Sequence, residues 1–262
     1  MRNYFTLLRK SFEMELSSEL AYKWNFIIKS VALVLLSIVT PLVTLLIYSN
    51  TSGIPGWGFE EFILFQGTII LVLGVGRFCM LEFPARVIQN IRKGEFEKFL
   101  TKPFDPLLYL TFSSVQIEGL AEIATGLALV AWSFIKLNLS IISIGFLLYI
   151  FLIILAILFV YSFMILISAL AFLFVDSWAL FDLFFRFTDL ARYPTSVYGA
   201  GVRFFITFIF PLAILGNYPA EALTKGISLG LILEIIIPVI IFFIISLFLW
   251  KWAMKKYTSA GG

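Results

Sequence analysis

Six long apolar runs, separated by short polar or charged stretches, set the pattern of this chain. A helix needs about 20 apolar residues to cross roughly 30 Å of hydrocarbon, which makes each run a candidate transmembrane helix. The six predicted helices cover about residues 26–48, 62–80, 112–135, 137–175, 204–220 and 227–250. The pattern therefore predicts an all-α polytopic membrane protein, with residues 1–262 forming a single transmembrane domain.

Two of these runs depart from a plain crossing. The fourth has no charged residue from Leu137 to Val175, which is too long for one straight crossing. We interpret it as one helix that is tilted or projects beyond the bilayer. The fifth is short and contains Pro211 and Gly216, so it is predicted to be broken.

The segment before the first run has the periodicity of an amphipathic helix. Its apolar residues recur every three or four positions, while Arg9, Glu13 and Ser17 occupy another face. The apolar positions are Phe5, Leu8, Phe12, Leu16 and Leu20. Residues 1–25 are therefore predicted to form an entry helix on the inner surface of the membrane.

Residues 176–203, between the fourth and fifth runs, carry a narrow polar stripe. Asp182, Arg186 and Asp189 follow an i, i+4, i+7 spacing within an otherwise apolar stretch. We predict a cytoplasmic interfacial segment here. For this segment and for the entry helix, a lipid-facing anchor without a partner is the alternative.

Composition agrees with a membrane protein, and the placement of charge predicts its orientation. Hydrophobic residues make up 61% of the chain and the mean hydropathy is +1.03, whereas soluble domains have roughly 45–50% apolar residues. With six crossings, all Lys and Arg residues except Lys136 and Lys225 fall on one side. Basic residues accumulate on the cytoplasmic side, so both termini are predicted to be cytoplasmic. The basic residues flank apolar runs, where they contact anionic lipid, so the net charge of +3 does not indicate nucleic-acid binding.

Several kinds of chemistry are excluded by missing residues. The chain has one cysteine, Cys79, and no histidine, so it lacks a disulfide and the commonest metal ligand and general base. It has no Gly-Lys dipeptide and hence no phosphate-binding P-loop. We predict no catalytic residues, no metal site and no cofactor in this chain.

The loop at residues 82–106 combines charge with an apolar face. Phe96, Phe99 and Leu100 share one face of a short helix, which a glycine precedes and a proline stops. Such a face on the cytoplasmic side either lies on lipid or docks into a groove of a partner. The candidate docking residues are Gly94, Glu95, Phe96, Glu97, Lys98, Phe99, Leu100, Lys102 and Pro103.

Three carboxylates fall within predicted transmembrane helices: Glu118, Glu122 and Glu234. Carboxylates inside a membrane are costly and usually face a bundle interior or a water-filled path. They are therefore candidates for a cation or proton site in a translocation path. In the alternative interpretation, Glu118 lies near the inner interface and Glu122 is protonated or hydrogen-bonded between helices.

Two stretches resemble the membrane subunits of type-2 ABC exporters, in the branch whose permease and ATPase are separate chains. One is the loop Gly94-Glu95-Phe96-Glu97…Leu100…Lys102-Pro103…Asp105-Pro106, and the other is Tyr193-Pro194…Val197-Tyr198, then Pro211, then Tyr218-Pro219-Ala220. Phe96 and Glu97 replace the more usual Leu and Asp of that branch. The resemblance extends over nearly the whole chain, through the six-helix layout and the entry helix.

The resemblance implies a permease in the plasma membrane of a prokaryote that forms a homodimer or heterodimer. It further implies that cytoplasmic ATP-binding cassette subunits, which hold ATP and Mg, dock on the entry helix and on the 82–106 loop. It also suggests that residues 204–226 include a broken, re-entrant outer element.

The sequence therefore favours a permease subunit of an ATP-driven exporter. The Phe-rich composition suits an amphiphilic or drug-like substrate, although lipid contact accounts for Phe equally well. The alternative is an ion-coupled secondary transporter that uses the intramembrane carboxylates, for which no internal repeat is evident.

Overall fold

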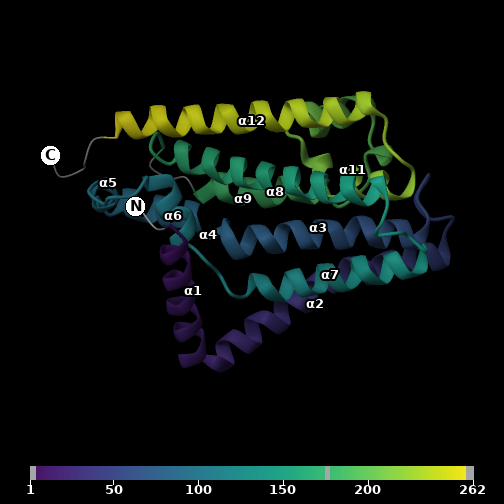
Figure 1. Ribbon diagram of the computed structural model, residues 1–262, viewed down its shortest axis with the longest axis horizontal. Helices are drawn as coiled ribbons and strands as arrows, with labels where there is room; N and C mark the ends of the chain where they lie inside the picture. Colours follow the sequence, from purple (N-terminus) through teal and green to yellow (C-terminus); the bar gives the residue numbers. More distant parts are fainter. Residues whose placement is uncertain (1–3, 175–177, 258–262) are drawn as a thin grey trace.

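The computed structural model describes residues 4–174 and 178–257. The described residues form helices and short connections, with no β-strand among them (Figure 1). The first part of the chain contains α1 (Tyr4–Ala21), α2 (Lys23–Asn50), α3 (Phe59–Cys79), α4 (Glu82–Arg92), α5 (Glu97–Leu100), α6 (Pro106–Ser113) and α7 (Gly119–Lys136). The second part contains α8 (Ile144–Leu170), α9 (Trp178–Leu190), η1 (Thr195–Val197), α10 (Ala200–Phe204), η2 (Phe205–Ile209), η3 (Leu212–Leu215), α11 (Asn217–Thr224) and α12 (Leu229–Lys256).

Five helical stretches of the described residues are long and apolar enough to cross a membrane. They are Lys23–Asn50, Phe59–Arg92, Gly119–Lys136, Ile144–Leu170 and Gly230–Lys256. They correspond to the first, second, third, fourth and sixth predicted helices. The all-α polytopic fold is thus confirmed, and the fifth predicted helix is the one that does not form a continuous crossing.

The long helices lie side by side in the order α12, α8, α3, α7 (Figure 1). α2 runs obliquely along α3 and α7, and its buried residues are only Pro41 and Thr44. One end of the bundle holds α4, α5 and α6, and we call it the α4–α6 end. The opposite end, here the α11 end, holds α11 and the turn at residues 51–58.

Two of the predicted helices have boundaries in the structure that differ from the sequence-based prediction. The third predicted helix, 112–135, is split, because α6 ends at Ser113 and α7 begins only at Gly119. The fourth run is shorter as a helix than its charge-free length suggests. Asn138 adopts a positive φ of 51°, and the Ser143 hydroxyl caps α8 by accepting from Phe146 N at 3.1 Å. A turn therefore takes up residues 137–143, and no projecting helix is needed.

Residues 178–199 cross the bundle from the α4–α6 end to the α11 end. In α9, the Phe184 ring packs on Phe163 of α8 with 5.1 Å between centroids. Beyond α9, Ser196 Oγ donates to the carbonyl of Pro55 in the turn at the α11 end, at 3.4 Å.

The sequence-based prediction that residues 176–203 stay at the end of the basic loop is therefore wrong, because the chain leaves that end within α9 and reaches the α11 end before residue 200. Residues 176 and 177 lie outside the described ranges. Trp178–Leu190 has only 13 helical residues, fewer than a crossing helix needs. The chain completes the distance with residues 191–199, which are mostly not helical, so a hydropathy pattern alone does not reveal the passage.

Residues 200–224 enter the bundle from the α11 end and return to it. Phe210, between η2 and η3, packs on Phe163 and Phe187, with centroid distances of 5.7 and 4.9 Å. Asn217 Oδ1 then accepts from the backbone N–H of Thr195 at 2.9 Å, which brings the chain back to the α11 end. The expected broken, re-entrant element is confirmed in this arrangement.

α1 lies across the α4–α6 end, roughly perpendicular to the long helices (Figure 1). Tyr4 packs edge-on against Phe104 with 5.3 Å between ring centroids, and Phe12 packs against Phe78. Of the predicted apolar face, Leu8 and Phe12 are half-buried, whereas the others are exposed. The entry helix therefore exists, and its contact with a membrane surface stays a prediction.

Candidate functional site

α3 and α7 pack so closely that glycine is required where they touch. A Cβ added to Gly126 would lie 2.5 Å from the backbone N of Leu71, and one added to Gly119 would lie 2.5 Å from the backbone N of Phe78. Gly67 and Gly74 make the matching close approaches from α3. Small residues at membrane-helix interfaces allow such contact between backbones. Gly74 therefore serves the close packing of α3 against α7.

A partly buried ion pair joins these two helices. Arg77 Nε donates to Glu122 Oε2 at 2.9 Å, and the two side chains are 27% and 11% exposed. Glu122 is thus held by a permanent cation from the neighbouring helix. Of the two interpretations of Glu122, the structure supports a hydrogen-bonded residue between helices, in the form of an ion pair.

The pair also lines a cavity of about 240 Å³ between α2, α3, α7 and α9. The polar residues on its walls are Ser37, Thr40, Gln66, Arg77, Glu122, Thr188 and Arg192. Gln66 is 3% exposed and its Nε2 donates to Thr44 Oγ1 at 2.7 Å. The cavity therefore combines apolar walls with fixed polar groups, which is typical of a small-molecule site.

Glu118 lies at the edge of an adjoining cavity, nearer the α4–α6 end. This cavity, of about 380 Å³, shares Leu33, Leu36 and Arg77 with the first. Lys29 of α2 donates to Glu118 Oε1 at 3.1 Å and lies 3.7 Å from Glu19 of α1. Glu118 is therefore also paired with a cation.

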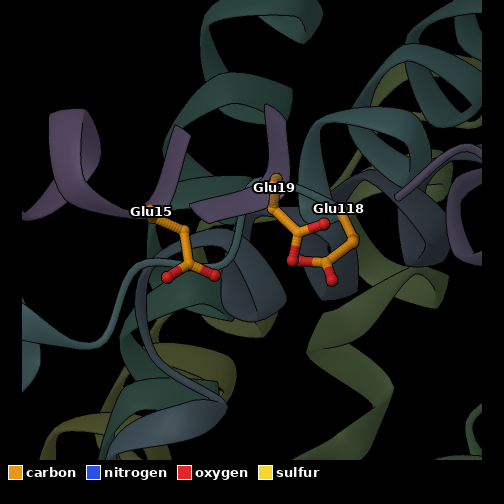
Figure 2. A group of neighbouring side chains, drawn as sticks. All are labelled: Glu15, Glu19 and Glu118. Carbon is orange, nitrogen blue, oxygen red and sulfur yellow. The ribbon is translucent and has the colours of Figure 1, made fainter. Parts of the chain in front are cut away.

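Figure 2 shows Glu15, Glu19 and Glu118 side by side, with their nearest carboxylate oxygens within 4.8 Å of one another. Burial and the neighbouring Glu118 raise the pKa of Glu15 above its ordinary value of 4.5. Because Lys29 already bonds two of these carboxylates, the group is explained as a charge cluster that joins α1, α2 and the start of α7. The prediction that the chain binds no metal stays a prediction.

Glu234 lies apart from the other two predicted carboxylates. It is on α12 and lines a cavity of about 460 Å³ near the α11 end, together with Arg203, Glu221 and Tyr218. Glu221 is paired there with Lys225 at 3.6 Å. The structure thus brings Glu118 and Glu122 into adjoining cavities and leaves Glu234 outside that site.

The apolar face of the 94–103 loop points into the protein. Phe96 is completely buried, and its ring packs on Phe172 at 4.8 Å, on Tyr257 at 5.5 Å and on Trp250 at 6.4 Å. Phe99 is 8% exposed. The expectation that these two side chains dock into a partner or on lipid is therefore wrong, because rings at the ends of α8 and α12 cover Phe96, and Phe99 packs on Phe96 and on Tyr109 of α6.

The outer surface of this loop carries charge. Glu95, Glu97 and Lys98 are exposed, as is Leu100 at 45%. Lys98 pairs with Glu95 at 2.7 Å, which lowers the pKa of Glu95. Gly94 has a φ of 67°, a conformation that favours glycine and lets the chain reverse after α4. Lys102 rests on the Tyr109 ring, and Pro103 is exposed.

Sequence reasoning missed Arg77, Lys29 and Arg192 as members of the candidate site. They were counted only as basic residues that determine orientation. Arg77 and Lys29 adjoin or interrupt apolar runs, which was a usable signal. Their partners, Glu122 and Glu118, lie 45 and 89 residues away in the chain and could not be identified from spacing.

Residues 27–261 match the model of one protein family, described as "ABC-2 family transporter protein". A comparison with curated proteins found no significant match. The matched region includes all five long apolar helices except the first residues of α2, together with the cavity and the 94–103 loop. Members of this family are the membrane components of transporters and work with an ATP-binding cassette subunit. The chain belongs to the ABC-2 transporter family.

Proposed function

We propose that this chain is the permease subunit of an ATP-binding cassette exporter, which moves an amphiphilic or drug-like substrate out of the cell. A partner subunit binds ATP and Mg and hydrolyses the nucleotide, and the permease itself performs no catalysis. The observation that carries this proposal is that the 94–103 loop is joined to the ends of α8 and α12 and, through α4, to α3, which lines the cavity.

Phe96 links the loop to the ends of α8 and α12, while α4 connects the same loop to α3. Interlocked aromatic rings transmit a displacement instead of absorbing it, since packed interiors have low compressibility. A push on the charged outer surface of the loop would therefore shift α3 relative to α8 and α12. The cavity with Arg77 and Glu122 lies on α3 and would change shape with it.

The cavity supports an amphiphilic substrate. Leu36, Ile69 and Leu73 offer apolar contact, whereas the Arg77–Glu122 pair and Gln66 offer charge and hydrogen bonds. An ion pair that is maintained within the apolar part of a membrane protein is costly, which favours a functional role over a purely structural one.

The ion-coupled alternative finds less support. A carboxylate that carries a transported cation or proton must be free to bind and release that cargo during each cycle, without a fixed cationic side chain in its place. Glu122 and Glu118 instead have a guanidinium and an ammonium within 3.1 Å. Glu234 has no ion pair among the described residues and is the remaining candidate for that alternative.

We further propose that the permease works as a dimer, either with a second copy or with a related permease, in the plasma membrane of a prokaryote. α2 supports this, because Leu35, Val39 and Leu42 are all more than half exposed in the single chain. Lipid covers whatever part of this surface the partner leaves free.

Orientation is tested by cysteine labelling. We expect Cys at position 52 or 138 (Ser52→Cys, Asn138→Cys) to react with an impermeant thiol reagent in whole cells. Ser11→Cys should react only after permeabilisation, because both termini are proposed to be cytoplasmic. Reaction of Ser11→Cys in intact cells would contradict the proposed topology.

The function is tested by co-expression with a neighbouring ATPase gene product. We expect the two chains to co-purify, and a panel of amphiphilic dyes to contain members that stimulate ATP hydrolysis. Glu97→Arg, on the exposed loop surface, should weaken association, whereas Glu60→Arg at the opposite end should not. ATPase activity that is insensitive to the permease in every combination would refute the proposal.

A further inference from the structure

We propose that the groove between α1 and the α4–α6 end binds the phosphate of an anionic phospholipid headgroup. The groove has a volume of about 420 Å³. Its basic side chains come from three different helices, namely Lys10 of α1, Arg86 of α4 and Lys98 of α5. Ser11, Asn90 and Tyr109 supply further polar groups.

The three cations are available to a ligand to different degrees. Lys10 has no ion pair or hydrogen bond among the described residues. Arg86 is half-buried and anchored, because its Nη1 donates to the carbonyl of Ser113 at 2.6 Å, which leaves its other N–H groups for a ligand. Lys98 shares its charge with the exposed Glu95. A guanidinium held in place beside the unpaired ammonium group of Lys10 is well suited to phosphate recognition.

One carboxylate, Glu15, also lines the groove. Its charge opposes an anion, and Glu95 offsets the charge of Lys98, which leaves Lys10 and Arg86 as the groove cations outside any ion pair among the described residues. Burial and Glu118 raise the pKa of Glu15, so Glu15 is protonated, and loses its negative charge, more readily than an ordinary carboxyl group. The balance of charge therefore favours an anionic ligand.

The position of the groove favours a lipid over a soluble anion. α1 lies perpendicular to the long helices, and so parallel to the surface of a membrane that they cross (Figure 1). Met14, which lines the groove together with Leu7, is 73% exposed. Apolar side chains beside a basic groove match the glycerol and acyl region of a phospholipid whose phosphate lies among the cations.

The test measures lipid retention by the intact permease. The protein is reconstituted in nanodiscs of phosphatidylcholine with a minor fraction of phosphatidylglycerol, and bound lipids are counted by native mass spectrometry after release. We expect selective retention of phosphatidylglycerol. Lys10→Gln should reduce that retention roughly fivefold, and Lys10→Gln with Lys98→Gln should reduce it further. Lys93→Gln removes the same charge from the same end outside the groove and should have no effect.

Competition separates the possible ligands. Soluble inorganic phosphate or glycerol phosphate should not displace the lipid, because neither makes the apolar contacts. Displacement by either compound would overturn the lipid assignment in favour of a soluble anion. Displacement by the partner ATPase would assign the groove to protein docking, and equal retention by the Lys10 and Lys93 variants would show that the groove is not a lipid site.

Discussion

Phe96→Ala is expected to release the 94–103 loop from the bundle. Phe96 is completely buried among aromatic rings from α8 and the end of α12, and truncation of a buried Phe to Ala costs about 3–5 kcal/mol. At about 1.4 kcal/mol for each factor of ten, even the lower value raises the open population of the loop about 100-fold. The remainder of the bundle should stay folded, because the loop lies at its end.

Limited trypsin digestion measures that opening, since Lys98 lies within the loop and is followed by Phe99. We expect cleavage there to accelerate by at least about two orders of magnitude in Phe96→Ala. Leu100→Ala is the matched control, because Leu100 is 45% exposed and its loss should change stability by no more than about 0.5 kcal/mol. Equal cleavage rates for the two variants would refute the argument that Phe96 fixes the loop.

Three further outcomes are expected. Gly126→Ala should lower the thermal unfolding temperature in detergent, with a cost of about 1–3 kcal/mol, whereas Gly201→Ala, whose new methyl group meets open space, should not. Glu122→Gln should destabilise more than the double variant with Arg77→Gln, as measured by a double-mutant cycle, because it leaves a partly buried guanidinium without its counter-ion. Glu15→Gln should protect α1 from proteolysis at neutral pH. A carboxyl whose folded pKa is raised opposes folding above its ordinary pKa of 4.5, so the protection should vanish below that pH.

The long apolar runs predicted most of the crossing helices because hydropathy reports burial in lipid directly. The passage at residues 178–199 was missed, since it is only partly helical and carries Asp182, Arg186 and Asp189. Backbone of this kind is tolerated at membrane depth when protein surrounds it, which no window of sequence reports.

The candidate site was predicted only in part for a related reason. Periodicity identified the apolar face of Phe96 and Phe99 but not the surface that covers it. An apolar face has the same sequence pattern whether a partner or the chain's own helices cover it. Likewise, Glu122 was recognised as unusual, whereas its bond to Arg77 depends on how α3 and α7 pack. Residue spacing predicts which side chains share one face of a helix. Which two faces contact each other is determined by the fold.

The re-entrant element has a consequence for biogenesis. Its backbone rests on α3, where a Cβ at Gly216 would lie 2.9 Å from the carbonyl of Phe65, and α11 packs along α8. Both supports precede residues 200–224 in the chain, so a ribosome delivers them first. An irregular segment that lipid would reject can then leave the translocon directly onto a protein surface. A circular permutation that places residues 200–224 ahead of α3 and α8 should therefore impair membrane insertion even though the final contacts are the same.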